Sequence, residues 1–194
     1  MNAPKNQADW ARLFRLACSL IGQVNSPTTI IDHWTFGGGA AMMLQIEHRE
    51  SHDVDLFLQD AQLLSFLDPE KRDFDFEIAP TGWSGDGTGF LKFTFAGIGE
   101  IDYIVGGPKT PNPTISRDIE GHFTLLETVA EVVTKKIVHR GASLRPRDIF
   151  DIAAASEQHA RSTGDTILTR IVSAGSIRLD PPGIELALAA VYSD

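Results

Sequence analysis

Residues 34–44 read WTFGGGAAMML, and residues 49–57 read RESHDVDLF. In the first segment, glycines precede an apolar, helix-prone stretch, and such a turn lets backbone N–H groups and a helix N-terminus approach an anion. In the second segment, Asp53 and Asp55 flank one apolar residue, so a strand would place both carboxylates on the same face. Two carboxylates on one face can share a cation. The pair of segments therefore indicates a site for a nucleotide and its magnesium ion.

The spacing of the two segments is more specific than either segment alone. A glycine turn before a helix usually serves only the backbone, and an Asp-x-Asp pair is usually solvated. Here 13 residues separate Gly39 from Asp53. This arrangement resembles the signature of the DNA polymerase β-like nucleotidyltransferase superfamily, in which a glycine pair opens a helix and the next strand carries two metal-binding aspartates. The resemblance implies an α+β fold with a mixed or antiparallel sheet flanked by helices.

The composition indicates a soluble globular protein. Of the 194 residues, 42% are hydrophobic and 22% are charged, and no run is long enough to span a bilayer. The N-terminal residues lack a signal-peptide pattern, and the one cysteine, Cys18, cannot form an internal disulfide, so we expect a cytoplasmic location and a buried structural thiol. The net charge of -9 argues against a broad nucleic-acid surface. One local basic cluster comprises Lys135, Lys136, His139, Arg140, Arg145 and Arg147.

Hydrophobic periodicity predicts the order of helices and strands. Helices are expected over 9–24, 40–47, 61–67, 126–140, 147–159, 165–175 and 182–192, and strands over 30–36, 53–58, 74–78, 90–95 and 99–105. Residues 82–89 are expected to form a loop or hairpin turn, and three prolines over 108–113 mark an extended linker, beyond which the pattern turns helical. These elements predict an α/β core over residues 1–115 and a C-terminal helical subdomain over residues 116–194, and the resemblance implies that the core is the nucleotidyltransferase part.

Asp102 lies at the middle of an expected strand, between Ile101 and Tyr103. A charge at that position has two explanations. The strand could lie at the edge of the sheet with one solvated face. Alternatively, Asp102 could be the third metal carboxylate, which the superfamily carries on a later strand beside the Asp-x-Asp strand.

Within that superfamily, the chain resembles the AbiEii-type nucleotidyltransferase toxins over about residues 34–155. The resemblance rests on the glycine turn, on HRESHDVDLF at 48–57, on EIDYI at 100–104, and on residues 127–136 followed by RDIFDI at 147–152. It implies that Asp53, Asp55 and Asp102 hold Mg²⁺ or Mn²⁺ and that Asp102 assists at the metal or activates the acceptor hydroxyl. Carried over by the resemblance, the nucleotide-binding residues are Gly37, Gly38, Gly39, Arg49, Ser51, Lys136, Arg140, Asp148 and Asp151. On a helical wheel Lys136 flanks the apolar stripe and Lys135 lies opposite, so Lys136 is better placed for a cleft.

Two features depart from the family pattern. Many relatives carry a serine or threonine after the glycine pair, where this chain has Gly39. Its phosphate site would then rely on backbone amides, or the chain would be a weakened member. The second departure is brevity, since many such toxins carry a longer C-terminal helical region, and this bears on the acceptor site.

The first functional hypothesis is a magnesium-dependent nucleotidyltransferase, in which cations bridge the triphosphate while an acceptor hydroxyl attacks the α-phosphorus. Its partners would be a nucleoside triphosphate, an acceptor and, for a toxin, a cognate antitoxin. The acceptor could be a tRNA 3' end, a protein hydroxyl or a small molecule, and we rank RNA or protein above a small molecule.

The second hypothesis is a catalytically weakened protein that binds a nucleotide or a partner. A glycosyltransferase using Asp-x-Asp ranks third. The six histidines show no zinc-ligand spacing.

Overall fold

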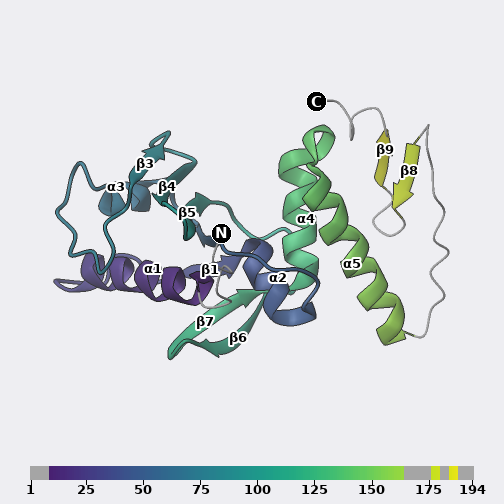
Figure 1. Cartoon of the computed structure of the whole chain (residues 1–194), viewed down its shortest axis with the longest axis horizontal. Helices are drawn as coiled ribbons and strands as arrows, with labels where there is room; N and C mark the ends of the chain where they lie inside the picture. The colour runs from purple at the N-terminus through teal and green to yellow at the C-terminus, as the bar shows by residue number, and fades with distance from the viewer. Residues whose placement is uncertain (1–8, 164–175, 180–183, 188–194) are drawn as a thin grey trace, which may run out of the picture. The chain divides into compact units, whose positions relative to one another are not determined.

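The computed structural model describes residues 9–163, 176–179 and 184–187 (Figure 1). The chain forms two compact units, Met1–Val132 and Val133–Asp194. The division falls later than the expected boundary at about residue 115. Each unit is described by itself below.

Unit 1 combines a mixed sheet with four helical segments. Its strands are β1 (Trp34–Gly37), β2 (Val54–Leu58), β3 (Gly82–Gly85), β4 (Phe90–Phe95), β5 (Gly99–Val105), β6 (Thr114–Ile119) and β7 (His122–Glu127). Its helices are α1 (Asp9–Asn25), α2 (Gly38–Ile46), the 3-10 turn η1 (Ala61–Leu63) and α3 (Leu64–Leu67), and α4 (Val129–Arg140) begins in this unit. The expected α+β fold class is confirmed.

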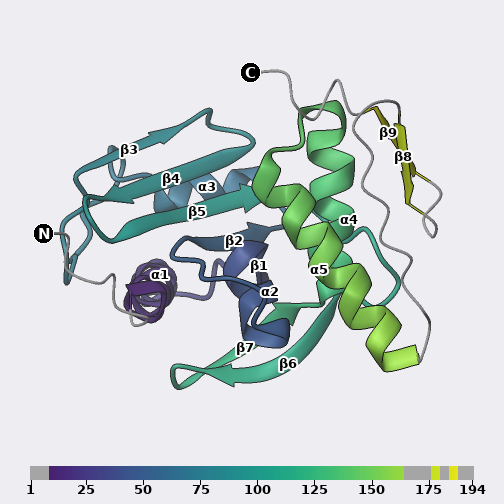
Figure 2. The ribbon, with the colours of Figure 1, turned by 45° about the vertical axis from the view of Figure 1, so that its right-hand side comes forward.

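The seven strands form one sheet in the order β3-β4-β5-β2-β1-β7-β6. β2 pairs with β5 in parallel and with β1 antiparallel, whereas β1 and β7 run parallel. Figure 2 shows the β3–β4 hairpin at one end of the sheet and the β6–β7 hairpin at the other. β2 and β5, which carry Asp55 and Asp102, are therefore internal strands.

The core of unit 1 lies between α1 and one face of the sheet. Leu13, Phe14 and Leu20 of α1 are fully buried, and the Phe14 ring packs on that of Phe36 in β1 at a centroid distance of 4.8 Å. Cys18 is buried in the same helix, as expected for a structural thiol, and burial raises its pKa to about 12. The alternation of β2 places Val54, Leu56 and Leu58 on this core face and leaves Asp55 and Phe57 on the other.

The Tyr103 hydroxyl joins β5 to α1. It donates a hydrogen bond of 3.0 Å to the Ala17 carbonyl oxygen in a fully buried position. We expect Tyr103→Phe to lower the free energy of unfolding by about 1 kcal/mol, because the bond is lost while the ring still fills its space. Urea denaturation measures this change. Tyr103→Leu should cost more, since it also leaves a cavity, and equal stability of Tyr103→Phe and wild type would contradict the prediction.

The structure corrects two expectations in the middle of the chain. Residues 74–78 form no strand, although their burial alternates. The Gln23 side chain of α1 instead donates to the Asp75 carbonyl and accepts from the Asp75 N–H, both at 2.9 Å. These bonds fix the segment to the helix rather than to the sheet. Residues 82–85, expected within a loop or hairpin turn, form the edge strand β3.

The helical pattern expected directly after the prolines is wrong over residues 114–127. This stretch forms the hairpin of β6 and β7, which completes the sheet. The helix expected over 126–140 exists from Val129, as α4, while Leu126 belongs to β7.

Unit 2 contains the rest of α4, the 3-10 turn η2 (Gly141–Ser143), α5 (Pro146–Thr163), β8 (Ser176–Leu179) and β9 (Ile184–Ala187). Buried Ile137, Leu144 and Ile152 form its described apolar cluster. The helix expected over 182–192 is wrong where the chain is described, because β9 pairs with β8. The helix expected over 165–175 lies outside the described residues. Within the described ranges, no helix combines the length and apolarity that a bilayer crossing requires.

Candidate functional site

Asp55 and Asp102 lie side by side on neighbouring strands. In the parallel pairing of β2 and β5 they are direct register partners, and Gly37 of β1 is the partner of Asp55 on its other side. Because paired residues share a face, both carboxylates project from the face opposite α1. The expectation of an edge position for Asp102 is wrong, since β5 lies between β4 and β2.

Gly38 begins α2 directly over Asp55. Its φ of +68° lies in the left-handed region, and a Cβ built on it would overlap the Asp55 carboxylate. Both observations require glycine at this position, for backbone conformation and for space. The N-terminus of α2 and the Asp55 carboxylate are therefore in direct contact.

Asp53 precedes β2, and its Oδ1 accepts a hydrogen bond of 3.2 Å from the Glu100 N–H. Lys92 on β4 faces Asp102 across the strand pair, with Nζ 3.3 Å from Asp102 Oδ2, and it also contacts Glu100. Burial raises the pKa of Asp102 above its usual value. Lys92 partly opposes this shift, while the Glu100 and Asp53 carboxylates add to it. The Lys92 ammonium thus partly offsets the negative charges of Asp102, Glu100 and Asp53.

The three aspartates fit a cation by chemistry, since carboxylate oxygens are the ligands that Mg²⁺ prefers, and Asp55 and Asp102 also share a face. In the described part of the chain, however, no three acidic, histidine or cysteine side chains already converge on one point. Asp53 is turned to a backbone amide and Asp102 to Lys92. Holding a cation between them would require these side chains to exchange those contacts for metal ligation.

Gly37 is packed against a second acidic group. A Cβ at Gly37 would overlap the Glu127 carboxylate and meet the Phe57 ring at 2.5 Å. Glu127, at the end of β7, is 1% exposed, and its Oε1 accepts a 2.6 Å hydrogen bond from the Thr35 hydroxyl. A buried carboxylate therefore stands beneath the glycine turn, and close packing explains the first glycine.

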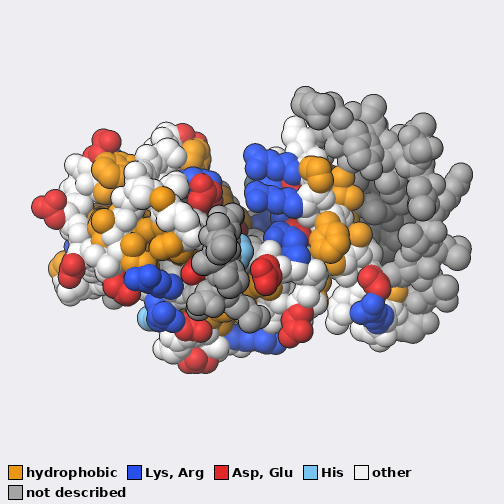
Figure 3. Space-filling view, viewed as in Figure 1, with side chains coloured by type: hydrophobic (Ala, Val, Ile, Leu, Met, Phe, Trp, Pro, Cys, Tyr) orange, Lys and Arg blue, Asp and Glu red, His pale blue; other side chains and the backbone are white. Residues whose placement is uncertain are grey.

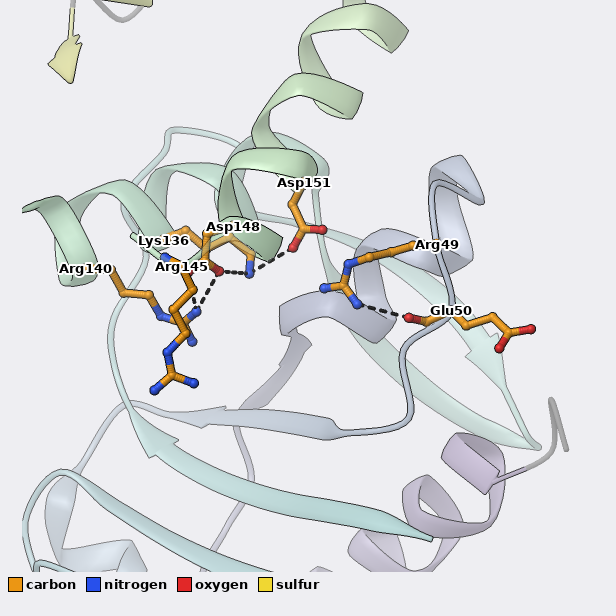
Figure 4. A network of polar contacts seen from close by, with 7 residues as sticks. All are labelled: Arg49, Glu50, Lys136, Arg140, Arg145, Asp148 and Asp151. Atoms are coloured by element: carbon orange, nitrogen blue, oxygen red, sulfur yellow. Dashed lines mark hydrogen bonds and ion pairs between the residues drawn. The ribbon is translucent and has the colours of Figure 1, made fainter. Parts of the chain in front are cut away.

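Gly39 meets side chains from the loop after α2. A Cβ at Gly39 would lie 2.8 Å from both Arg49 Nη2 and Ser51 Oγ. Arg49 also donates through Nη1 to the Glu50 carbonyl at 3.0 Å (Figure 4). The structure thus brings the predicted residues 37–39, 49 and 51 together at the start of α2.

In unit 2, four of the predicted residues form one ion-pair network (Figure 4). Lys136 Nζ lies 2.9 Å from Asp148 Oδ1 and 3.0 Å from Asp151 Oδ2. Arg140 Nη1 donates to both oxygens of Asp148, at 2.6 and 2.8 Å, and the Arg145 N–H donates to Oδ2 at 3.0 Å. Asp148 and Asp151 are fully buried. The network ties α4 to the first turns of α5.

The electrostatics of this network favour a charged Asp148. Burial alone would raise the pKa of its carboxyl, but the hydrogen bonds from Arg140, Lys136 and the Arg145 N–H hold that pKa far below its usual value. The adjacent Lys135 is also buried, at 5% exposure, so both lysines are enclosed. Lys136 forms ion pairs with the two aspartates. Figure 3 shows Lys and Arg side chains gathered beside α4, where basic residues were expected to cluster.

The sequence analysis did not assign a site role to Lys92, Glu127 or Glu131. Glu131 is fully buried, and its carboxylate accepts hydrogen bonds of 2.8 Å from the backbone N–H groups of Lys109 and Thr110. Of these three residues, Lys92 is the one whose position could be predicted from the sequence. Counting back from the turn at residues 96–98 along two antiparallel strands places it opposite Asp102.

One family of known proteins matches this chain over most of its length. The family model described as "Nucleotidyl transferase AbiEii toxin, Type IV TA system" matches residues 24–190. Among solved structures, the chain is similar to an antigenic nucleotidyltransferase-like protein from Paracoccidioides brasiliensis, with 19% identity, a TM-score of 0.40, and coverage of 73% of this chain and 77% of that chain. No curated protein matches the chain. The family match spans the glycine turn, all three aspartates and the network in unit 2.

Proposed function

Since the chain belongs to the AbiEii family of nucleotidyl transferase toxins from type IV toxin–antitoxin systems, we propose that it is a Mg²⁺-dependent nucleotidyltransferase. Its donor is a nucleoside triphosphate and its acceptor is a hydroxyl, either of a tRNA 3' end or of a protein. As a toxin it acts in a cell that also makes a cognate antitoxin. The observation that carries the proposal is the register of Asp55 beside Asp102 under the glycine turn.

The chemistry follows from the charges at this point of the fold. The acceptor oxygen attacks the α-phosphorus, the bond from that phosphorus to the bridging oxygen breaks, and pyrophosphate leaves. The proton of the acceptor hydroxyl passes to a carboxylate, for which Asp102 is the candidate because it lies beside Asp55 on the neighbouring strand. A bound cation would offset the charge of the triphosphate. Asp53, Asp55 and Asp102 are the residues that would hold it, and the N-terminus of α2 would face the phosphates.

Titration calorimetry tests this proposal with the four ribonucleoside triphosphates, each with and without Mg²⁺. We expect one or more of them to bind only with Mg²⁺, and the double variant Asp53→Ala, Asp55→Ala to bind none. The donor so identified, labelled at the α-phosphate, is then incubated with tRNA or with total protein to find the acceptor. Absence of Mg²⁺-dependent binding to the wild type would overturn the transferase and favour a partner-binding protein.

Lys92 gives a separate test of the cation site. Lys92→Met should lower the thermal midpoint in the absence of metal, because the partly buried Asp102 loses its positive neighbour; the expected cost is about 1–3 kcal/mol. Added Mg²⁺ should then stabilise Lys92→Met more than it stabilises the wild type, since the cation replaces the lost charge. Differential scanning calorimetry measures both effects.

The matched control for Lys92 is Lys71→Met. Lys71 pairs with Asp68 at 3.1 Å, but its side chain is 62% exposed, so its loss should change neither stability nor the response to Mg²⁺. An equal Mg²⁺ response in Lys92→Met and wild type would argue against a cation at Asp102.

A further inference from the structure

β3 is an exposed edge of the sheet. It is the terminal strand in the order of the described sheet, where it pairs with β4 alone (Figure 2). Its four residues, Gly82–Gly85, include no charged side chain and no proline, the features that commonly protect an edge strand against pairing with another chain. Trp83 is 48% exposed. The strand can therefore accept a partner along its outer side.

The backbone of β3 has hydrogen-bonding groups that the described sheet does not use. Just beyond the strand, the Asp86 N–H donates to the Phe90 carbonyl oxygen at 3.3 Å. Because inward and outward groups alternate along an antiparallel ladder, the register of β3 with β4 then turns the N–H and C=O groups of Trp83 and Gly85 away from β4. These groups are available to a further extended strand.

A cavity of about 300 Å³ lies beside this edge. Trp83 and Gly85 line it together with Leu91 of β4 and Leu64 of α3. Side chains alternate along each strand and paired residues share a face, so Trp83 projects from the face opposite to that of Asp102. The cavity therefore lies on the other side of the sheet from Asp102.

The charged side chains around this cavity favour a cation. Asp68 and Glu70 line it with one basic residue, Lys71, and Asp86 follows β3 directly in the chain. Lys71 pairs with Asp68 at 3.1 Å, which leaves the Glu70 carboxylate without an ion pair among the described residues. An indole ring beside carboxylates suits arginine or lysine, whose stem packs on apolar groups while its head stays near the negative charge.

We propose that β3 binds an extended basic segment of a partner protein, which adds a strand to the sheet beside Trp83 and Gly85. The occupant is a peptide because the edge offers backbone donors and acceptors at the spacing of a strand. It is basic because carboxylates outnumber ammonium groups around the cavity. Arginine or lysine at alternate positions of the segment enters the cavity against Trp83 and near Glu70. This surface is separate from the proposed cation site and does not depend on the proposed function.

The probe is a fluorescein-labelled hexapeptide that alternates arginine with threonine, and fluorescence polarisation measures its binding to the wild type. We expect a dissociation constant below about 1 mM, and no binding of the matched peptide with glutamate in place of arginine. Methylation of the arginine backbone nitrogens should weaken binding about tenfold or more, since in antiparallel addition these N–H groups donate to β3. Methylation of the threonine nitrogens, which point away from β3, should leave binding unchanged. Equal effects of the two methylations would overturn the inference, because an added strand uses one of its two edges.

Variants then locate the peptide on the protein. Trp83→Ala should weaken binding about tenfold, whereas the control Phe123→Ala, which removes another exposed aromatic ring from β7, should not change it. Glu70→Gln should weaken binding about threefold. The double variant Asp53→Ala, Asp55→Ala should bind as wild type does. Loss of binding in that variant would place the peptide at the proposed cation site and overturn the inference, as would no binding of the arginine peptide to wild type. The methylated peptides are tested on wild type, so poor folding of Trp83→Ala would leave that part of the test intact.

Discussion

Replacing Asp55 by asparagine is expected to abolish Mg²⁺-dependent binding of the donor triphosphate and to slow nucleotide transfer by about a thousandfold or more. A cation shared between two or three carboxylates loses one of its charged ligands, and the electrostatic stabilisation of the phosphates is lost with it. The asparagine side chain keeps the size of aspartate, so the space under Gly38 stays filled. The measurement is the initial rate of label transfer from an α-labelled triphosphate to tRNA.

The same substitution should leave the fold intact. Removing one of two adjacent carboxylates relieves like-charge repulsion with Asp102, so the thermal midpoint of Asp55→Asn without metal should equal or exceed that of wild type. Asp32→Asn is the control, because the Asp32 side chain is 65% exposed and lies outside the site. A fully active Asp55→Asn enzyme would remove the metal site from the mechanism, whereas an unfolded one would show that Asp55 is needed for structure.

The second large effect is expected in unit 2, where Asp148→Ala should lower the free energy of unfolding by about 3–5 kcal/mol. The substitution removes one of the two ion pairs of Lys136, whose side chain is 11% exposed, and leaves the pair with Asp151. It also removes the bonds that Arg140 and the Arg145 N–H donate. Denaturant unfolding measures the change. Glu157→Gln is the matched control, since the Arg161–Glu157 pair is exposed on both sides and should contribute little.

Asp148 also predicts a pH dependence. Its pKa is lower in the folded chain than in the unfolded chain, where it is about 3.9. The stabilisation is therefore complete above about pH 5 and is lost as the pH falls through the unfolded value toward the folded one. Wild type should lose stability between about pH 5 and pH 2, and Asp148→Asn should lose less over the same interval. Parallel pH profiles for the two proteins would contradict this assignment.

The sequence predicted the parts of the site that depend on local periodicity. Glycines before an apolar, helix-prone stretch predict the turn, and strand alternation predicts that Asp55 and Asp102 lie on the face opposite the buried one. Their side-by-side register could not be predicted, because it depends on the pairing of β2 with β5, which are 40 or more residues apart. The roles assigned to the site residues stay predictions until the binding experiments are done.

The β6–β7 hairpin shows why other parts were missed. Its two-residue loop is Glu120-Gly121, and both residues have positive φ, as the common tight hairpin turns require. Glycine signals such a turn, but glutamate in its first position does not, so the apolar stripe of the following helix dominated the prediction. The segment at 74–78 failed for the opposite reason. Its alternation was real, but a glutamine side chain supplied the backbone partners that a neighbouring strand would have provided.

The contact between Gly38 and Asp55 also bears on how descendants of this chain can diverge. Any side chain at position 38 overlaps the Asp55 carboxylate, so a lineage that keeps Asp55 cannot accept substitutions at 38. Loss of the aspartate to a smaller residue would lift that steric barrier and leave only the backbone conformation to select glycine. In related sequences that are losing the activity, we therefore expect position 55 to change before position 38. Sequences that retain the pair, as this one does, stand at the start of that order.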